Sequence, residues 1–181
     1  SQAMENLLNN NEHVFLDLKC RIGILKAVVM ENSVSMEKTI LVKALFSSAM
    51  KLPGSDKKCS FLQEFGEFCQ SIGEIGDARL CCLEALRSAM ELPASDAKCT
   101  FLIHTGELCE HISDIALAQQ CFYEALNTYK EESNVYKKPR YVEFEMERRL
   151  GRLAKGMFRV DSAKRYHFDR AAVILRQHVA T

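Results

Sequence analysis

The chain has 181 residues, 48% of them hydrophobic, and its 24 Lys and Arg residues balance its 24 Asp and Glu residues. This composition is too apolar for a disordered chain, and the length allows a sizeable buried core. With only 8 Gly and 3 Pro, the chain favours long helices over a fold with many turns. No run of about eighteen uninterrupted apolar residues occurs, so no membrane insertion is predicted.

The first residues show no basic segment followed by an apolar one, so no signal peptide is predicted. Residues 1–4 are interpreted as a tag remnant, residues 1–3, followed by a native start at Met4. Residues 5–181 are predicted to form a single domain.

A period of forty residues organises the chain. The segment 49–62 recurs as 89–102, and ten of its fourteen positions are identical. The same register then pairs Gly66 with Gly106, and matching cysteines and alanines follow it. A period of this length is typical of one supersecondary unit that buries its apolar face by stacking on its neighbours.

Apolar residues within each period recur at three- and four-residue steps, which predicts amphipathic helices. A Pro lies between successive units at positions 53, 93 and 139, where a missing N–H costs least. The prediction is therefore an all-α chain of about four helical hairpins, with eight helices, over residues 11–51, 55–91, 95–132 and 140–178. The first hairpin is degenerate, and the polar stretch 131–138 before the last is read as either a longer helix or a longer loop.

Helix ends are predicted from capping residues. Ser55 and Ser95 are expected N-caps, and Gly73 is expected to end a helix. Asp77 and Asp114 are expected to cap the second helices of their hairpins. Gly66 and Gly106 are expected where the two helices of a hairpin touch.

The chain has eight cysteines, and three pairs of them lie one repeat apart: Cys59 and Cys99, Cys69 and Cys109, Cys81 and Cys121. Equivalent places in successive units suit small buried apolar side chains. There is no C-x-x-C and no zinc-finger spacing, so neither a disulfide nor a metal site is expected. So many free thiols favour a reducing compartment, and a cytoplasmic or nuclear location is predicted.

At this point the chain resembles the tetratricopeptide repeat (TPR) superfamily, in a variety with a forty-residue period. The matching residues are Leu62-x-x-Phe65-Gly66-x-x-Cys69 with Ala78, Cys82 and Ala85, and Leu102-x-x-Thr105-Gly106-x-x-Cys109 with Ala118, Phe122 and Ala125. The fourth unit is weaker, with Leu150-Gly151 and with His167 where Phe is usual. The resemblance implies a right-handed solenoid of helical hairpins.

The resemblance also implies a non-catalytic adaptor or scaffold whose first helices line a concave groove for a protein or peptide partner. Carried over residue by residue, the partner-binding positions are Gln63, Glu67, Gln70, Thr100, Ile103, Glu107, Glu110, Arg148, Arg152 and Lys155. The partner is expected to be basic where it meets the glutamates and acidic where it meets the last unit. A merely solvated helix side would be equally polar, and that alternative stays open.

Charge is unevenly spread along the chain. Residues 135–181 carry 12 Lys/Arg and 5 Asp/Glu, while residues 1–134 carry 12 and 19. This asymmetry suits either partner steering or end-to-end contact between molecules, so a self-associating structural module is the alternative function. The basic end also allows an RNA-binding helical repeat, but a pI near 6.9 makes nucleic acid a less favoured partner. No catalytic motif occurs, so neither an enzyme nor a cofactor is predicted.

Overall fold

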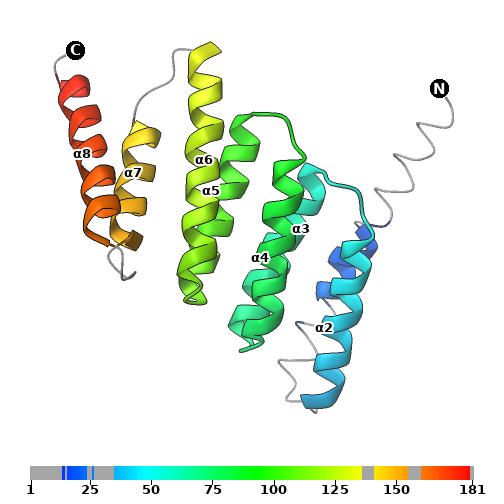
Figure 1. Ribbon diagram of the computed structural model, residues 1–181. Coiled ribbons are helices and arrows are strands. Elements are labelled where there is room, and N and C mark those ends of the chain that lie inside the picture. The colour runs from blue at the N-terminus through cyan, green and yellow to red at the C-terminus, as the bar shows by residue number, and fades with distance from the viewer. Residues whose placement is uncertain are drawn as a thin grey trace, which may run out of the picture. The chain divides into compact units, whose positions relative to one another are not determined.

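The computed structural model describes residues 14, 16–23, 26, 35–135, 141–154 and 160–179. The all-α prediction is confirmed over these residues, none of which lies in a strand (Figure 1). No helix among them is long and apolar enough to cross a membrane. The chain forms two compact units, Ser1–Glu91 and Leu92–Thr181. A single domain over residues 5–181, and the handedness of its stacking, stay predictions.

Unit 1 contains a helical segment at 16–23 followed by α2 (Ser35–Met50), α3 (Asp56–Ser71) and α4 (Ile75–Met90). Helices α3 and α4 pack against each other as an antiparallel hairpin, and α2 contacts both (Figure 1). The core of the hairpin combines large residues of α3 with small ones of α4, which lets the two helices approach closely. The buried side chains include Phe61, Leu62, Phe65, Cys69, Ala78, Cys81, Cys82, Ala85 and Ala89.

The ends of α3 follow the prediction. The Ser55 hydroxyl accepts a hydrogen bond from the Lys58 backbone N–H at 3.2 Å, so it caps the first turn. Gly73 lies just beyond the last turn with φ of 80°, a left-handed conformation that glycine adopts without steric cost. The prediction that Asp77 caps α4 is wrong. The helix begins two residues earlier, at Ile75, and the carboxylate instead lies in the first turn, where it favours the helix dipole.

Unit 2 contains α5 (Asp96–His111), α6 (Ile115–Val135), α7 (Tyr141–Ala154) and α8 (Val160–Val179), each packed on the next. Both predicted caps are confirmed. Ser95 accepts from the Lys98 N–H at 3.1 Å, and Asp114 Oδ1 accepts from the Leu117 N–H at 3.1 Å. The stretch that the sequence left open continues as helix as far as Val135, so α6 is longer than α4.

Gly106 lies where α5 meets α6, as predicted. A Cβ at this position would stand 2.7 Å from Cε1 of the Phe122 ring and 2.9 Å from its Cζ. Real Cβ atoms do not approach another carbon so closely, so the ring occupies the space that the missing side chain leaves. Gly66 holds the same place on α3, and it too is buried.

The prediction of buried thiols is confirmed for seven cysteines and wrong for Cys20, which is exposed. Burial raises the pKa of the Cys59 thiol to about 12. A hydrogen bond with Cys69, together with burial, raises the pKa of Cys81 as well. A protonated thiol is a poor nucleophile and a poor metal ligand, so these two side chains act as small core residues.

A buried lysine explains part of the repeated motif. The Lys58 side chain is 1% exposed, and its Nζ donates to the Leu52 carbonyl at 2.8 Å and lies 2.5 Å from Glu84 Oε1. Lys98, one period later, donates to the Leu92 carbonyl at 3.0 Å. Each lysine therefore binds the carbonyl that immediately precedes the proline between two hairpins. Both lysines therefore satisfy a backbone carbonyl at a junction between hairpins, and a buried carbonyl without a donor would be costly.

Candidate interaction faces

Two ion pairs join α5 to α7 in unit 2. Arg149 Nη1 lies 2.7 Å from Glu107 Oε1, and Arg152 Nη2 lies 2.8 Å from Glu110 Oε1. Their helices are the first of two successive hairpins. We call the surface formed by Glu107, Glu110, Glu145, Arg148, Arg149 and Arg152 the α5–α7 face.

Arg149 is the central residue of this face, although it was not among the predicted partner-binding positions. Besides Glu107, its guanidinium contacts Glu145 at 3.2 Å and stands 5.4 Å from the centroid of the Phe122 ring. Burial lowers the pKa of Arg149, but the hydrogen bonds from its side chain to both carboxylates outweigh burial and raise it. The side chain thus holds α5, α6 and α7 together. The four-residue spacing of Glu145 and Arg149 was the available signal.

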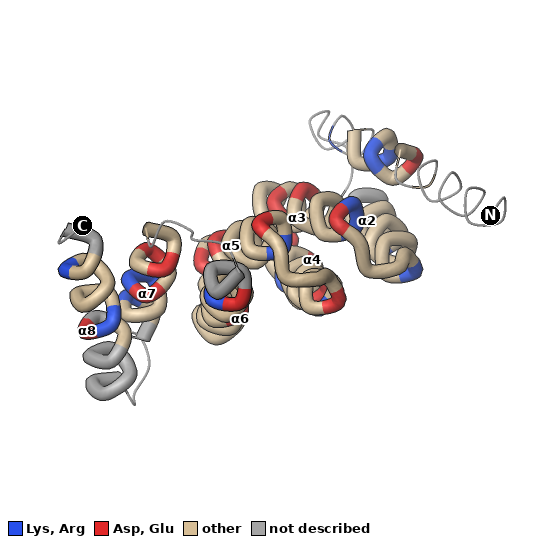
Figure 2. Tube along the Cα trace, turned by 90° about the horizontal axis from the view of Figure 1, so that it is seen from above, with Lys and Arg blue, Asp and Glu red and all other residues tan. Residues whose placement is uncertain are grey.

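Arg148, the neighbouring residue on α7, also binds Glu145. It donates twice to Glu145, at 2.9 and 2.7 Å, the bidentate geometry that suits a guanidinium and a carboxylate. The hydrogen bonds from Arg148, followed by those from Arg149, lower the pKa of Glu145. Along α7 the glutamates at 143, 145 and 147 precede the arginines at 148, 149 and 152, and Figure 2 shows both signs of charge on this helix.

The pairing changes how the predicted charges act. Glu107 and Glu110 were expected to attract a basic segment, and Arg152 an acidic one. In the structure the glutamates and the arginines of this face neutralise one another. Arg152 and Arg148 nevertheless keep 54% and 48% of their side chains exposed, and Glu107 keeps 36%. The α5–α7 face therefore presents paired, partly exposed polar side chains rather than two blocks of unpaired charge.

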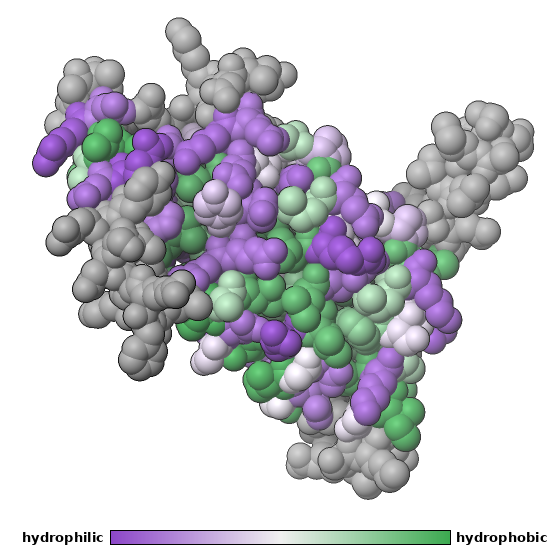
Figure 3. Space-filling view, in the orientation of Figure 1, coloured by the Kyte–Doolittle hydropathy of each residue, from purple (hydrophilic) through white to green (hydrophobic). Residues whose placement is uncertain are grey.

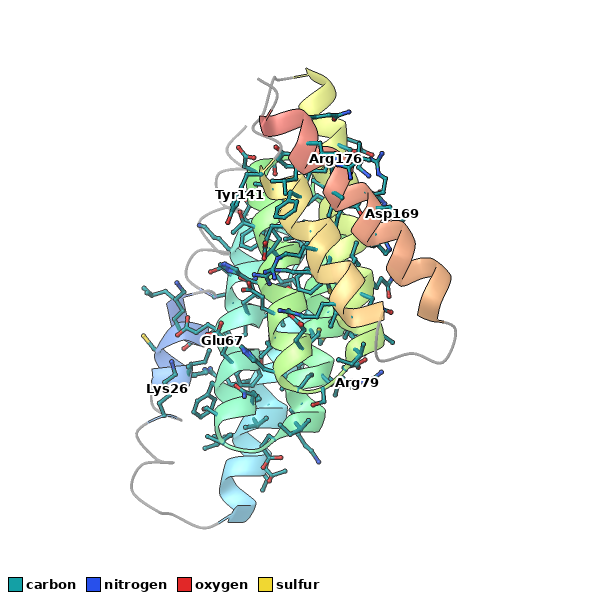
Figure 4. The ribbon with its side chains drawn as sticks, turned by 90° about the vertical axis from the view of Figure 1, so that its left-hand side faces the viewer. Lys26, Glu67, Arg79, Tyr141, Asp169 and Arg176 are labelled. Carbon is teal, nitrogen blue, oxygen red and sulfur yellow. The ribbon has the colours of Figure 1, made fainter. Side chains whose placement is uncertain are left out.

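The predicted residues of unit 1 lie on α3. Glu67 is exposed, and Gln63 and Gln70 are partly buried. Nearby, Glu64 Oε1 pairs with Lys26 Nζ at 3.3 Å. Figure 4 shows Glu67 on the side of the hairpin that carries Lys26, and Arg79 of α4 on the opposite side.

The remaining predicted positions are less informative. Thr100 is exposed, and its hydroxyl donates to the Asp96 carbonyl of its own helix at 2.8 Å. Ile103 is partly buried on α5. Lys155 lies outside the described residues. The structure thus brings together Glu107, Glu110, Arg148 and Arg152 on one face of unit 2.

A second polar group, also missed from the sequence, is buried between α7 and α8. The Glu147 side chain is 1% exposed and lies 2.6 Å from Nδ1 of His167. Lys130 Nζ and Arg170 Nε each stand 3.7 Å from its other oxygen. His167 occupies the place where Phe is usual, so this acid–histidine pair fills a position that Phe122 fills in the preceding hairpin. The signal in the sequence was His167 itself, a polar residue at a position where the repeat usually has a buried Phe.

In the described part of the chain, no group of three or more His, Cys, Asp or Glu side chains could hold a metal ion. Comparisons of the chain with protein-family models, with curated proteins and with solved structures each return no match.

Proposed function

We propose that the chain is a non-catalytic adaptor that binds a protein or peptide segment across the α5–α7 face. The observation that carries the proposal is the pair of bridges, Arg149 to Glu107 and Arg152 to Glu110, which makes one surface from the first helices of two hairpins. The resemblance to tetratricopeptide repeats supports it, because in that family the first helices line the binding groove.

The chemistry of the face indicates how a partner is held. A bound segment can replace the present ion-pair partners of Arg152, Arg148 and Glu107, because these three side chains are partly exposed. Surface ion pairs contribute little to stability, so exchanging one costs little. Such contacts specify the partner through their pattern of charge more than through affinity.

A charge swap tests the proposal without dismantling the fold. Glu110→Arg combined with Arg152→Glu keeps an attractive pair between α5 and α7 but reverses the pattern that a partner meets. Proteins captured from lysate by the wild-type chain should be lost by the swapped chain, while circular dichroism and the melting temperature stay the same. The matched control is the swap of Lys26 and Glu64, a pair in unit 1. An unchanged set of captured proteins would refute the α5–α7 face as the binding surface.

A further inference from the structure

A buried polar cluster connects α8 to the rest of unit 2. The Glu147 side chain of α7 is 1% exposed, and its Oε2 lies 2.6 Å from Nδ1 of His167 on α8. Its other oxygen, Oε1, stands 3.7 Å from Lys130 Nζ of α6 and 3.7 Å from Arg170 Nε of α8. Arg170 also reaches Glu143 of α7, at 3.4 Å. We call these five residues the Glu147 cluster.

The fold does not require polar groups at this place. The last hairpin repeats the preceding one at a step of forty-five residues, which relates Glu147 to Leu102 and His167 to Phe122. Leu102 and Phe122 are each 0% exposed. Replacing a buried charged pair by well-packed apolar residues is often neutral or stabilising, and this chain carries the apolar solution one hairpin earlier. The polar pair therefore indicates a role beyond packing.

The docking of α8 depends on the interface that contains this pair. Among the described helices, α8 packs chiefly on α7, and Figures 1 and 4 show the two lying alongside each other. Its apolar anchors include Ala171 and Ile174, which are 4% and 2% exposed. The outer surface over the described part of α8 is largely hydrophilic (Figure 3). A change in the attraction between Glu147 and His167 therefore acts directly on how tightly α8 is held.

His167 is the member of the cluster that can change its charge near neutral pH. Imidazole is the side chain that ordinarily gains a proton between pH 8 and pH 5. At 2.6 Å the imidazole donates its Nδ1–H to the carboxylate, because an ionised carboxylate only accepts. The ring is 16% exposed, so a second proton can reach it from solvent. That proton makes the ring a cation and adds Coulomb attraction to the existing hydrogen bond.

The other charges of the cluster bear on the sign of the effect. Lys130 and Arg170 oppose a positive charge on His167, and Glu143 favours it. Both cations stand beside Oε1 of Glu147, the oxygen that His167 does not contact, and both are 3.7 Å from it. Coulomb energy falls with distance, so the direct contact of the imidazole with Oε2 dominates. Protonation of His167 is therefore expected to strengthen the link between α7 and α8.

We propose that Glu147 and His167 form a pH-sensitive latch, in which protonation of His167 tightens the docking of α8 on α7 and deprotonation loosens it. The added attraction is present in mildly acidic solution, where the imidazole is charged, and is lost as pH rises toward 8. This range lies above the one in which carboxylates such as Glu84 titrate, so the two effects are separable. The latch does not rest on the function proposed for the α5–α7 face.

Hydrogen exchange of the full chain, read by mass spectrometry at pH 5.5 and pH 8 and corrected for intrinsic exchange rates, tests the latch. Protection of the α8 amides should fall by at least about fivefold from pH 5.5 to pH 8. Protection of the α3 amides, which are remote from the cluster in sequence and belong to unit 1, should change by less than about twofold.

Three variants serve as controls. His167→Gln retains a donor to Glu147 but never gains charge, so protection of its α8 amides should not depend on pH. Glu147→Leu combined with His167→Phe installs the residues that the preceding hairpin carries, so it should fold and should also lose the pH response. His104→Gln removes an exposed imidazole from α5 and should keep the response.

Several outcomes overturn the proposal. Equal protection of α8 at the two pH values means that His167 holds no latch. Greater protection at pH 8 means that Lys130 and Arg170 repel the charged ring more strongly than Glu147 attracts it. A pH response that survives in His167→Gln, or that is equal in α3 and α8, belongs to other groups. The Glu110–Arg152 swap should leave the α8 response unchanged, so failure of the adaptor proposal and failure of this one are distinguishable.

Discussion

At the scale of single residues, the most informative feature is a pair of opposite charges buried inside the α3–α4 hairpin. Lys58 and Glu84 have side chains 1% and 4% exposed, and they face each other across α3 and α4. Burial raises the pKa of Glu84, but hydrogen bonds from Arg87 and Lys58 outweigh it and hold the pKa below its usual value. Desolvating two charges is costly, so the pair stabilises the hairpin only while both partners are present.

We expect Lys58→Met to destabilise the protein by about 3–5 kcal/mol, because it leaves a buried carboxylate with one partner fewer and the Leu52 carbonyl without its donor. Lys57→Met is the matched control: it makes the same substitution at the adjacent, exposed position, and it should change stability by less than about 0.5 kcal/mol. Urea unfolding monitored by circular dichroism measures both. Equal stabilities of the two variants would mean that the buried pair contributes nothing.

The same variant has a pH signature. Because the folded-state pKa of Glu84 is lowered, its stabilising contribution is present above the unfolded-state value of about 4.3 and is lost as pH falls through the folded-state pKa. The stability gap between wild type and Lys58→Met should therefore be full at neutral pH and narrow in acid. A gap that stays constant from pH 7 to below the folded-state pKa would show that Glu84 is not the group concerned.

At the scale of helical elements, the close approach of α5 and α6 depends on a glycine, Gly106. Gly106→Ala places a Cβ against Phe122, the ring that also supports Arg149. We expect a loss of about 1–3 kcal/mol, because the ring has to move within a packed core. The loss should be smaller in a Phe122→Cys background, since cysteine is the residue that the preceding hairpin carries at this place.

Gly76→Ala provides the control for this substitution. It lies in the first turn of α4 with nothing within 4 Å of a built Cβ. The change should be neutral or stabilise by up to about 1 kcal/mol, because alanine has less unfolded-state freedom. Thermal melts of the three single variants and the double variant measure the effect. A Gly106→Ala protein as stable as Gly76→Ala would contradict the packing of α5 on α6.

The elements could be predicted because their determinants are local. Apolar periodicity gave the helices, and Ser55, Ser95 and Asp114 marked their starts correctly. Asp77 did not, because Asp at the N-cap and Asp inside the first turn are both favourable and spacing alone does not separate them. The pairing of Arg149 with Glu107 lay beyond prediction, since it joins residues of different hairpins and depends on the distance between helices. Lys58 was visible as a repeated residue, but its buried partner was not.

At the scale of the whole molecule, the opposite net charges of residues 1–134 and 135–181 predict a salt-dependent attraction between molecules. Residues 1–134 carry −7 and residues 135–181 carry +7. Since charges are screened over about 30 Å at 0.01 M salt but about 8 Å at 0.15 M, attraction between unlike ends should be strong only at low salt. The second virial coefficient from static light scattering should be negative at 0.01 M and rise as salt is added.

A charge variant separates this attraction from hydrophobic contact through Leu80 and Leu83, which are exposed on α4 of unit 1. Lys137→Glu with Lys138→Glu lowers the positive charge of residues 135–181 and leaves Leu80 and Leu83 in place. The variant should associate less than wild type at low salt. Hydrophobic contact, in contrast, persists or strengthens as salt rises. Association that is insensitive to salt and to these two lysines, but is lost with Leu80→Gln and Leu83→Tyr, would show that unit 1 and not charge asymmetry brings the molecules together.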